Sequence, residues 1–456
     1  MRAGEEEAAA NDGVWTPARR ALTVGLVVTI TLVAFEAFAI ATVMPLVKKD
    51  LGGIELYGWV FSAFFLGSLI GIVFTGRAAD HIGPARPFAL GLLLFGAGLL
   101  AGGLAPSMGA LVAARAVQGI GAGVIPAVAY IAVGRGYPAR SQPRMFAVIS
   151  TAWVIPGLIG PAIAGAVADA TGWRWVLLGL LPLVLVAGVA TAPALARLGA
   201  PGGAPPEDRR VDALLLTLGA ALVLGGASVH ELFLAVALVV IGAMVGARSF
   251  VRITPPGTTR LVSGMPAAIA LRGLATFAFF GTDAYVTLTL TQEHHTSATV
   301  AGAALTAAAL TWTAGSWVQE RRIHMIGARV LVRVGFAVIA LGAAGMVLVA
   351  ATDVPIAVAV LAWGIGGLGM GLSYSPVSFV VLGAAPEGGE GVATAALQLC
   401  DTLGVALGTG ASGAIIAAGA ALHWDGATAL ELSFAMCTAI AVVAGMLTSR
   451  LPAARS

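Results

Sequence analysis

The stretch Gly76-Arg77-Ala78-Ala79-Asp80-His81-Ile82-Gly83-Pro84-Ala85-Arg86 places charged and turn-forming residues in a short gap between two long apolar runs. The chain has 456 residues, of which 59% are hydrophobic and only 10% are charged, and its mean hydropathy is +0.95. Soluble domains carry about 25% charged residues. In so apolar a chain, the gap predicts a loop at the surface of a lipid bilayer, and the fold class is therefore an all-α membrane protein.

Charge and cysteine content exclude other classes. The net charge of +3 is small, and the basic residues form no patch with interleaved aromatic residues, so we expect no nucleic-acid partner. Cys400 and Cys437 both lie inside apolar runs. They provide no disulfide framework and say nothing about the redox compartment.

Apolar runs of about 18 residues or more, long enough to cross a bilayer, recur along the chain. Six precede a polar, proline-containing stretch at 197–210, two follow that stretch, and six more follow a basic loop at 248–260. The first run follows acidic residues, not a basic segment, so we interpret it as a retained helix and not as a signal peptide. The predicted spans lie near 22–45, 57–75, 87–105, 108–134, 145–168, 175–195, 212–228, 231–248, 264–290, 297–317, 329–350, 354–382, 391–420 and 428–449.

These fourteen spans predict two six-helix bundles plus two inserted central transmembrane helices. The predicted parts are a cytoplasmic N-terminal tail (1–21), an N-terminal bundle (22–195), cytoplasmic linkers with the two extra helices (196–263), a C-terminal bundle (264–449) and a cytoplasmic C-terminal tail (450–456).

Lysine and arginine in short loops indicate the orientation, because they favour the cytoplasmic side. Only Lys48, Lys49 and Arg174 fall on the outer side if the amino terminus is cytoplasmic. We therefore predict a multi-pass protein of the plasma membrane with both termini in the cytoplasm. The residues on the inner side are then Arg19, Arg20, Arg77, Arg86, Arg135, Arg140, Arg144, Arg209, Arg210, Arg248, Arg252, Arg260, Arg321, Arg322, Arg329, Arg333 and Arg450.

An internal repeat relates the two predicted bundles. The fourth span contains the glycine-rich segment 119–123 with Pro126 beyond it, and the twelfth contains the segment 364–369 with Pro376 beyond it. The loop 315–329 resembles the opening stretch in degraded form, without an Asp at the matching place. The alternative is that the glycines only allow close helix packing, as in any membrane protein.

The opening stretch resembles the signature loop between the second and third helices of major facilitator transporters. Its matching residues are Gly76, Asp80, Gly83 and Arg86, whereas Pro84 replaces a basic residue of the family pattern. The resemblance implies a conformational latch in which the Asp lies near a helix terminus and basic residues bridge to it. A carboxylate near a helix amino terminus is stabilised by about 0.3–1 kcal/mol.

Three further segments carry the resemblance over nearly the whole chain. Arg115 with Gln118, Gly119, Gly121 and Gly123 is similar to the fourth-helix motif, which contains a buried arginine. Gly157, Gly160, Pro161 and Gly165 resemble the antiporter motif of the fifth helix, where proline and glycine permit bending and close approach. The segment 36–45 is similar to the first-helix motif of the fourteen-helix drug:proton antiporter branch, with Glu36 in place of Asp and Ala41 in place of Asn.

Ionisable residues inside spans are functional candidates, because a charge at the bilayer centre costs at least about 2.5–3.5 kcal/mol. Glu36 and Arg115 lie at similar depth, so they could pair, either as a proton-coupling device or as a static ion pair. Arg272 and Asp401 could form a second pair. Asp283 has no basic residue at its level and could be a protonatable or cation-recognising acid, or could be simply solvated.

The predicted function is proton-driven efflux, by antiport and alternating access, of hydrophobic or amphipathic small molecules such as drugs. The alternatives are a proton-coupled importer, a lipid or metabolite exporter of the same fold and, more remotely, a receptor that does not transport. The sequence contains no catalytic constellation and no phosphate-binding loop, so we predict no enzyme activity. We expect no metal, since His294-His295 fits a solvated loop, and no cofactor other than the proton as coupling ion. The expected partners are the small-molecule substrate, protons and the lipid bilayer, with the protein as a monomer.

Overall fold

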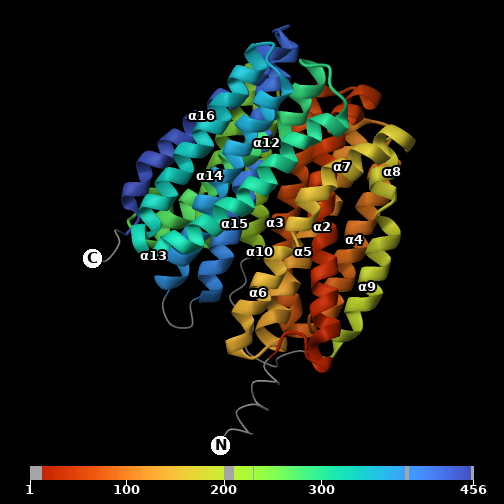
Figure 1. Ribbon diagram of the computed structural model, residues 1–456, viewed down its shortest axis with the longest axis vertical. Helices are drawn as coiled ribbons and strands as arrows, with labels where there is room; N and C mark the ends of the chain where they lie inside the picture. The colour runs from red at the N-terminus through yellow and green to blue at the C-terminus, as the bar shows by residue number, and fades with distance from the viewer. Residues whose placement is uncertain (1–12, 200–209, 230, 386–389, 453–456) are drawn as a thin grey trace, which may run out of the picture.

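The computed structural model describes residues 13–199, 210–229, 231–385 and 390–452, and these residues are almost entirely helical, without a strand (Figure 1). Thirteen of the described helical segments are long and apolar enough to cross a membrane. The all-α membrane fold is therefore confirmed. The helices of the first half are α2 (Pro17–Leu51), α3 (Tyr57–Ile82), α4 (Ala85–Gly103), α5 (Met108–Gly136), α6 (Gln142–Thr151), α7 (Val154–Thr171), α8 (Trp173–Leu178) and α9 (Leu181–Ala196).

The fifth and sixth predicted spans are both interrupted. The helix predicted at 145–168 is α6 followed by α7, with a break at 152–153, and the helix predicted at 175–195 continues from α8 into α9 across a break at 179–180. Pro156 and Pro182 lie in the first turns of α7 and α9. Proline lacks the N–H that would continue a preceding helix but is tolerated in the first turn of a new one, so each span restarts there.

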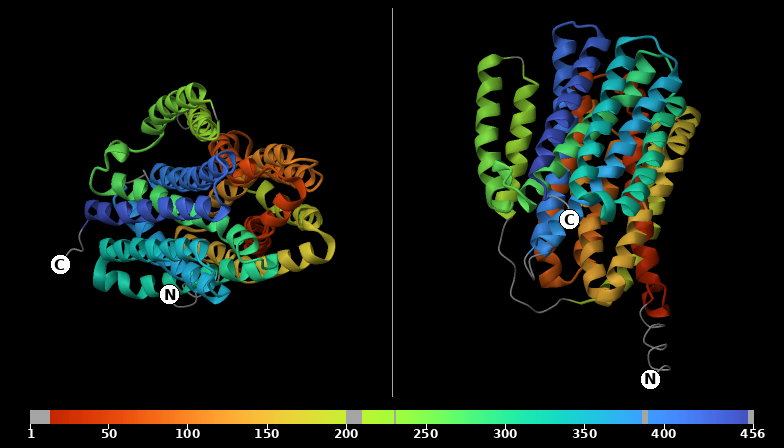
Figure 2. Two further views of the ribbon diagram at one scale, coloured as in Figure 1. Left: turned by 90° about the horizontal axis from the view of Figure 1, so that it is seen from above. Right: turned by 60° about the vertical axis from the view of Figure 1, so that its left-hand side comes forward.

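The remaining helices are α10 (Arg210–Ala227), α11 (Leu232–Ile253), α12 (Met265–Gln292), α13 (Ala298–Ala351), α14 (Ile356–Gly383), α15 (Glu390–Ala421) and α16 (Gly426–Leu447). Short 3₁₀ turns occupy Ile54–Leu56, Ala139–Ser141, Thr258–Arg260 and Thr448–Arg450. The predicted pair of extra helices corresponds to α10 and α11. They are central in the chain but stand at the side of the molecule, where α10 contacts α3 and α15 (Figure 2).

Helix α13 contains two membrane-crossing limbs. Its 54 residues would extend about 80 Å at 1.5 Å per residue, whereas a bilayer core is about 30 Å thick. Gly327 breaks the helix with φ 78° and ψ 156°. With this break, the thirteen long helices of the described residues provide fourteen crossings. The predicted loop at 315–329 is thus helical up to Ile326.

The same break occurs after α3. Gly83 has φ 77° and ψ 166°, nearly the conformation of Gly327. Both values lie in the region that glycine adopts at little cost and other residues rarely enter. The backbone therefore repeats the opening loop in the second half, with Gly327 at the place of Gly83. His324, three residues before Gly327, occupies the place of Asp80.

Helix packing also fixes the register of the repeat. A Cβ added to Gly119 would lie 2.0 Å from the carbonyl oxygen of Phe64, and one added to Gly367 would lie 2.1 Å from that of Ala308. Helix α5 thus packs on α3 as α14 packs on the first limb of α13. The twelfth-span counterpart of Gly119 is Gly367, so the segment that repeats 119–123 is 367–371, which ends two residues beyond the segment 364–369.

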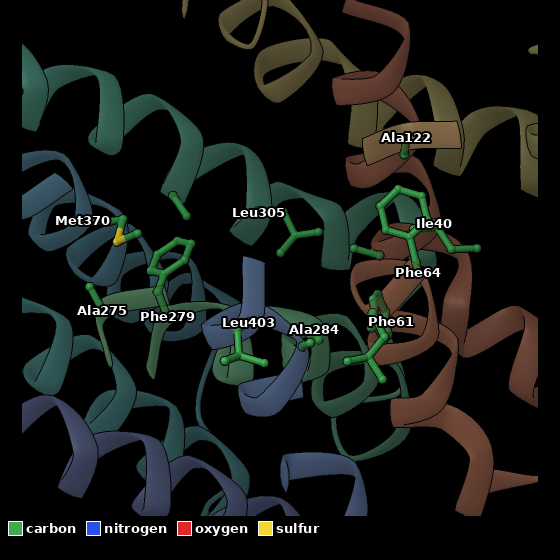
Figure 3. Close-up of a cluster of buried hydrophobic side chains, with 14 of the residues drawn as sticks. Ile40, Phe61, Phe64, Ala122, Ala275, Phe279, Ala284, Leu305, Met370 and Leu403 are labelled. Carbon is green, nitrogen blue, oxygen red and sulfur yellow. The ribbon is translucent and has the colours of Figure 1, made fainter. Parts of the chain in front are cut away.

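Buried side chains from both halves form a shared apolar core (Figure 3). The bundles also exchange hydrogen bonds. Thr287 on α12 donates to the carbonyl oxygen of Ala41 on α2 (2.6 Å), and Ser62 on α3 donates to that of Ala406 on α15 (3.0 Å). The core residues labelled in Figure 3 are Ile40, Phe61, Phe64, Ala122, Ala275, Phe279, Ala284, Leu305, Met370 and Leu403.

Candidate functional site

Glu36 on α2 and Arg115 on α5 form an ion pair inside the N-terminal half. Their side chains are 0% and 2% exposed. The Nη1 of Arg115 donates to Oε1 of Glu36 and also to Oε1 of Gln118, at 2.7 Å from the latter. Its Nε donates to the carbonyl oxygen of Val60 on α3 (3.2 Å), and its guanidinium carbon lies 4.1 Å from the ring centroid of Phe64. The predicted pairing of Glu36 with Arg115 is therefore present, and Gln118 is part of it.

Two polar atoms beside this pair are left over. Oε2 of Glu36 and Nε2 of Gln118 are buried and have no hydrogen-bond partner among the described residues. A buried polar atom without a partner costs about 1–3 kcal/mol. The site therefore retains unused hydrogen-bonding capacity directly at its carboxylate.

Arg272 on α12 and Asp401 on α15 approach each other more loosely, with 3.8 Å between Nη1 and Oδ1. Arg272 donates instead to the hydroxyl of Ser378 and lies with its guanidinium carbon 3.4 Å from the ring centroid of Tyr374. The hydroxyl of Tyr374 donates to Oδ2 of Asp401 (3.2 Å). The predicted second pair is thus a three-residue cluster. Tyr374 was missed, because no sequence pattern connects it to the two charges.

Asp283 on α12 has a neutral partner. The indole Nε1 of Trp363 on α14 donates to its Oδ1 (2.7 Å), and no basic side chain of the described residues forms an ion pair with it. Trp363 stands one helical turn before Gly367, as Arg115 stands one turn before Gly119. The sequence did not reveal Trp363 as a site residue. Aligning the two glycine-rich helices through Gly119 and Gly367 would have found it.

The segment 76–86, which we predicted to be a loop and call the latch loop, is helical except at Gly83 and Pro84. An ion pair anchors it to α5. Arg135 Nη2 donates to Oδ1 of Asp80 (2.6 Å), and its Nη1 donates to the carbonyl oxygen of Ala79 (3.3 Å). Asp80 lies in the last turn of α3, the end at which a helix dipole disfavours a carboxylate. Helix α3 therefore does not give the Asp80 carboxylate the stabilisation expected from a helix amino terminus. Arg135 stabilises this carboxylate instead.

The other latch residues behave differently. Arg86 is exposed and forms no hydrogen bond or ion pair with another described side chain, so it does not bridge to Asp80. A Cβ on Gly76 would meet nothing within 4 Å. Packing in this structure therefore does not require a glycine at position 76. Gly83, in contrast, forms the turn between α3 and α4.

The antiporter motif lies between the bundles. A Cβ on Gly157 would lie 2.8 Å from Cβ of Ala309, and one on Gly165 would lie 2.6 Å from Oγ1 of Thr299, so both glycines of α7 face the first limb of α13. Gly160 faces α2, next to Phe38. Helix α7 is continuous through Pro161. The break in this span lies at 152–153, before the motif.

We predicted that His294-His295 lies in a solvated loop and does not bind a metal ion. Among the described residues, no group of three or more His, Cys, Asp or Glu side chains is arranged to hold a metal ion. His294 Nε2 lies 2.9 Å from the carbonyl oxygen of Val349.

Burial raises the pKa of the neighbouring Glu293 carboxyl, and Asp425 raises it further, whereas the two histidines and Lys48 lower it.

Buried acids held by a basic or aromatic partner in two repeated bundles are features of a membrane transporter. Residues 26–409 match the family model described as Major Facilitator Superfamily. This chain belongs to the Major Facilitator Superfamily. It is therefore a transporter and not an enzyme.

Curated relatives of this facilitator-family protein include a probable multidrug-efflux transporter of Mycobacterium tuberculosis (strain H37Rv). The two sequences are 27% identical over 437 residues, which are 91% of each chain. The multidrug transporter protein MdtP of Bacillus subtilis is 30% identical over 169 residues, 37% of this chain and 31% of its own.

Solved structures share the facilitator fold. The human organic anion transporter MFSD10 has a TM-score of 0.62 at 16% identity, covering 95% of this chain and 99% of its own. A peptide transporter crystallised with sulfate has a TM-score of 0.68 at 15% identity, covering 94% and 93%. At such identities the likeness establishes the fold alone.

Proposed function

We propose that this protein is a proton-driven antiporter that exports hydrophobic or amphipathic small molecules by alternating access. We assign it to the fourteen-helix drug:proton antiporter branch and place it in the plasma membrane with both termini in the cytoplasm. The observation that carries the proposal is the buried ion pair of Glu36 and Arg115 in a transporter. The full-length relative named as a probable multidrug-efflux transporter supports the direction and the substrate class.

The chemistry of coupling follows from the partners of Arg115. A buried carboxylate beside an arginine remains ionised, and separating the two leaves a buried charge that protonation removes. Gln118 Oε1 already accepts from the same Nη1 (2.7 Å). When Glu36 takes up a proton, Arg115 therefore keeps one acceptor on its own helix and another at Val60. Proton uptake would then cost less than breaking an isolated buried pair.

The antiporter motif supports export. Gly157 and Gly165 bring α7 close to the first limb of α13, across the boundary between the bundles. Movement of one bundle against the other must change this close contact, so the motif lies where it can oppose leakage between two states. An antiporter must prevent the unloaded protein from reorienting, whereas a symporter of the same fold returns unloaded.

The test is proton-coupled transport in proteoliposomes with Glu36→Gln. With ethidium as a lipophilic cation, we expect ethidium-driven proton movement to fall to background in this variant, because the amide neither takes up nor releases a proton near neutral pH. Ethidium exchange between the two faces should persist. Glu55→Gln, the same change on the exposed turn after α2, is the matched control and should leave coupling unchanged.

Unchanged coupling in Glu36→Gln would refute the assignment of the proton carrier. The direction of transport is a separate measurement: in oriented vesicles, ethidium accumulating with protons on the same side would identify an importer. Wild-type protein that moves neither ethidium nor a panel of apolar metabolites and lipids with protons would indicate a receptor.

A further inference from the structure

One face of α12 carries a row of chemically distinct side chains. Arg272, Thr276, Phe279, Phe280 and Asp283 follow one another at spacings of three to four residues, apart from the adjacent phenylalanines, and such residues share a helix face. At 1.5 Å per residue, Arg272 and Asp283 are about 16 Å apart along the axis. A positive charge therefore marks one end of the row, a carboxyl marks the other, and aromatic rings lie between them.

Aromatic residues from α13 and α14 extend this row into a cluster. Phe279 stacks on Trp363, with centroids 4.8 Å apart and planes at 22°, and meets Trp312 edge-on at 5.4 Å. Trp312 also lies 5.4 Å from the ring of Tyr374 and 6.3 Å from that of Phe280. Figure 3 shows Phe279 between α12 and Met370 of α14. The cluster joins three helices of the C-terminal half.

The cluster is not fully closed. Phe279 and Trp363 are buried, but Trp312, Phe280, Tyr374 and Asp283 are only half-buried although they lie within the bundle. Part of each of these four residues is thus open to solvent. The negative face of an aromatic ring attracts a cation, with a gain of about 0.5–2 kcal/mol.

Asp283 differs from the other two acids of the bundle interior. Arg115 pairs with Glu36 and Arg272 faces Asp401, whereas Asp283 is bonded only to the neutral indole of Trp363. That bond uses Oδ1 and fixes the direction of the carboxyl. A cation arriving at Asp283 would need to displace no resident arginine or lysine of the described residues.

We infer that Asp283, Trp312 and Phe280 form a binding site for a monovalent aromatic cation, with Trp363 as the residue that positions Asp283. The rings of the ligand lie against Trp312 and Phe280, and its charge lies at the carboxyl. Asp283 is the one carboxyl in this row of side chains, so it matches a single positive charge on the ligand. This inference rests on the proposed function, since it names the substrate class of the same transporter, but it concerns binding and does not require proton coupling.

The test is equilibrium binding to the purified full-length protein in detergent, without a proton gradient. The probes are tetraphenylphosphonium and the neutral triphenylphosphine oxide, which has similar rings without the net charge. In Asp283→Asn we expect the affinity for tetraphenylphosphonium to fall by about tenfold, the equivalent of about 1.4 kcal/mol, and that for triphenylphosphine oxide to change less than about twofold. Asp353→Asn removes a carboxylate from an exposed outer loop and should leave both affinities unchanged.

Two ring variants separate a binding role from a structural one. Trp312→Ala should weaken both probes by roughly threefold to thirtyfold, as loss of a cation–π and stacking surface predicts, whereas Trp317→Ala on the exposed side of the same helix should not. Trp363→Phe keeps a stacking ring but removes the indole donor. It should weaken tetraphenylphosphonium binding more than triphenylphosphine oxide binding, because only the former depends on the direction of the carboxyl.

The inference fails if Asp283→Asn binds tetraphenylphosphonium as tightly as Asp353→Asn does, or if it loses both probes equally. If Asp283→Asn does not fold, equal binding by Trp312→Ala and Trp317→Ala overturns the site. Charge-selective binding at Asp283 in a protein whose vesicles show no proton-coupled transport would leave the site standing and refute the proposed function. Proton-coupled transport with no effect of Asp283→Asn or Trp312→Ala on binding would do the reverse.

Discussion

Single residues distinguish two bundles whose backbones are closely alike. Asp80 and Arg135 form an ion pair at 2.6 Å, with exposed fractions of 31% and 23%. In the second half, His324 has the place of Asp80 relative to the glycine break, and Gly383 has the place of Arg135 relative to the repeated glycines. The counterpart of the latch loop therefore has the turn without this ion pair.

We accordingly expect Asp80→Asn to slow transport by about tenfold, the factor that corresponds to about 1.4 kcal/mol in a barrier, whereas His324→Ala should change it little. Half-exposed ion pairs contribute only about 0–1 kcal/mol to stability, so the melting temperature should hardly move. Ethidium transport rates in vesicles, with protein amounts matched, provide the measurement. Equal losses in the two variants would mean that both halves share the latch.

At the scale of helices, close approach depends on a few glycines. A Cβ on Gly123 would lie 2.1 Å from the carbonyl oxygen of Ser68, and one on Gly371 would lie 2.2 Å from that of Trp312. The backbone cannot move away from an added Cβ in the way that a flexible side chain can. Helices α3 and α5 therefore lie about as close together as two helix backbones can, and so do the first limb of α13 and α14.

Gly123→Ala should destabilise the protein by about 1–3 kcal/mol, the usual cost of overpacking. Gly134→Ala is the matched control on the same helix, because a Cβ there would meet nothing within 4 Å. It should be neutral or slightly stabilising. Thermal unfolding in detergent, followed by the loss of monodisperse protein, compares them, and an equal melting temperature for both variants would contradict the close packing described for α5.

Helix existence could be predicted from the sequence better than helix continuity. Hydropathy is averaged over about 19 residues, so it located all the crossings but passed over the breaks before Val154 and Leu181, where single prolines withhold N–H groups. Partners were predicted when both carried charge, as for Glu36 and Arg115. Trp363 and Tyr374 were missed as partners of Asp283 and Asp401, because a neutral partner can be recognised only from the register of helices that are distant in sequence.

At the scale of the molecule, helix α12 offers a direct test of topology. Arg260 lies just before its first turn and His295 just after its last, and both side chains are exposed. With the proposed orientation, an impermeant maleimide applied to intact cells should label His295→Cys at once and Arg260→Cys only after permeabilisation. Cys400 and Cys437 are buried and should give little background. Labelling of Arg260→Cys alone in intact cells would invert the topology.

The different partners of the three interior acids have an electrical consequence. The charges of Glu36 and Arg115 cancel, as do those of Asp401 and Arg272, so an ionised Asp283 leaves one uncompensated negative charge within the bundles. The membrane voltage acts on a charge that crosses it with about 2.3 kcal/mol per 100 mV. It would therefore bias the resting orientation of the empty protein. A proton or a monovalent cation at Asp283 cancels that charge, and the loaded protein then reorients without sensing the voltage.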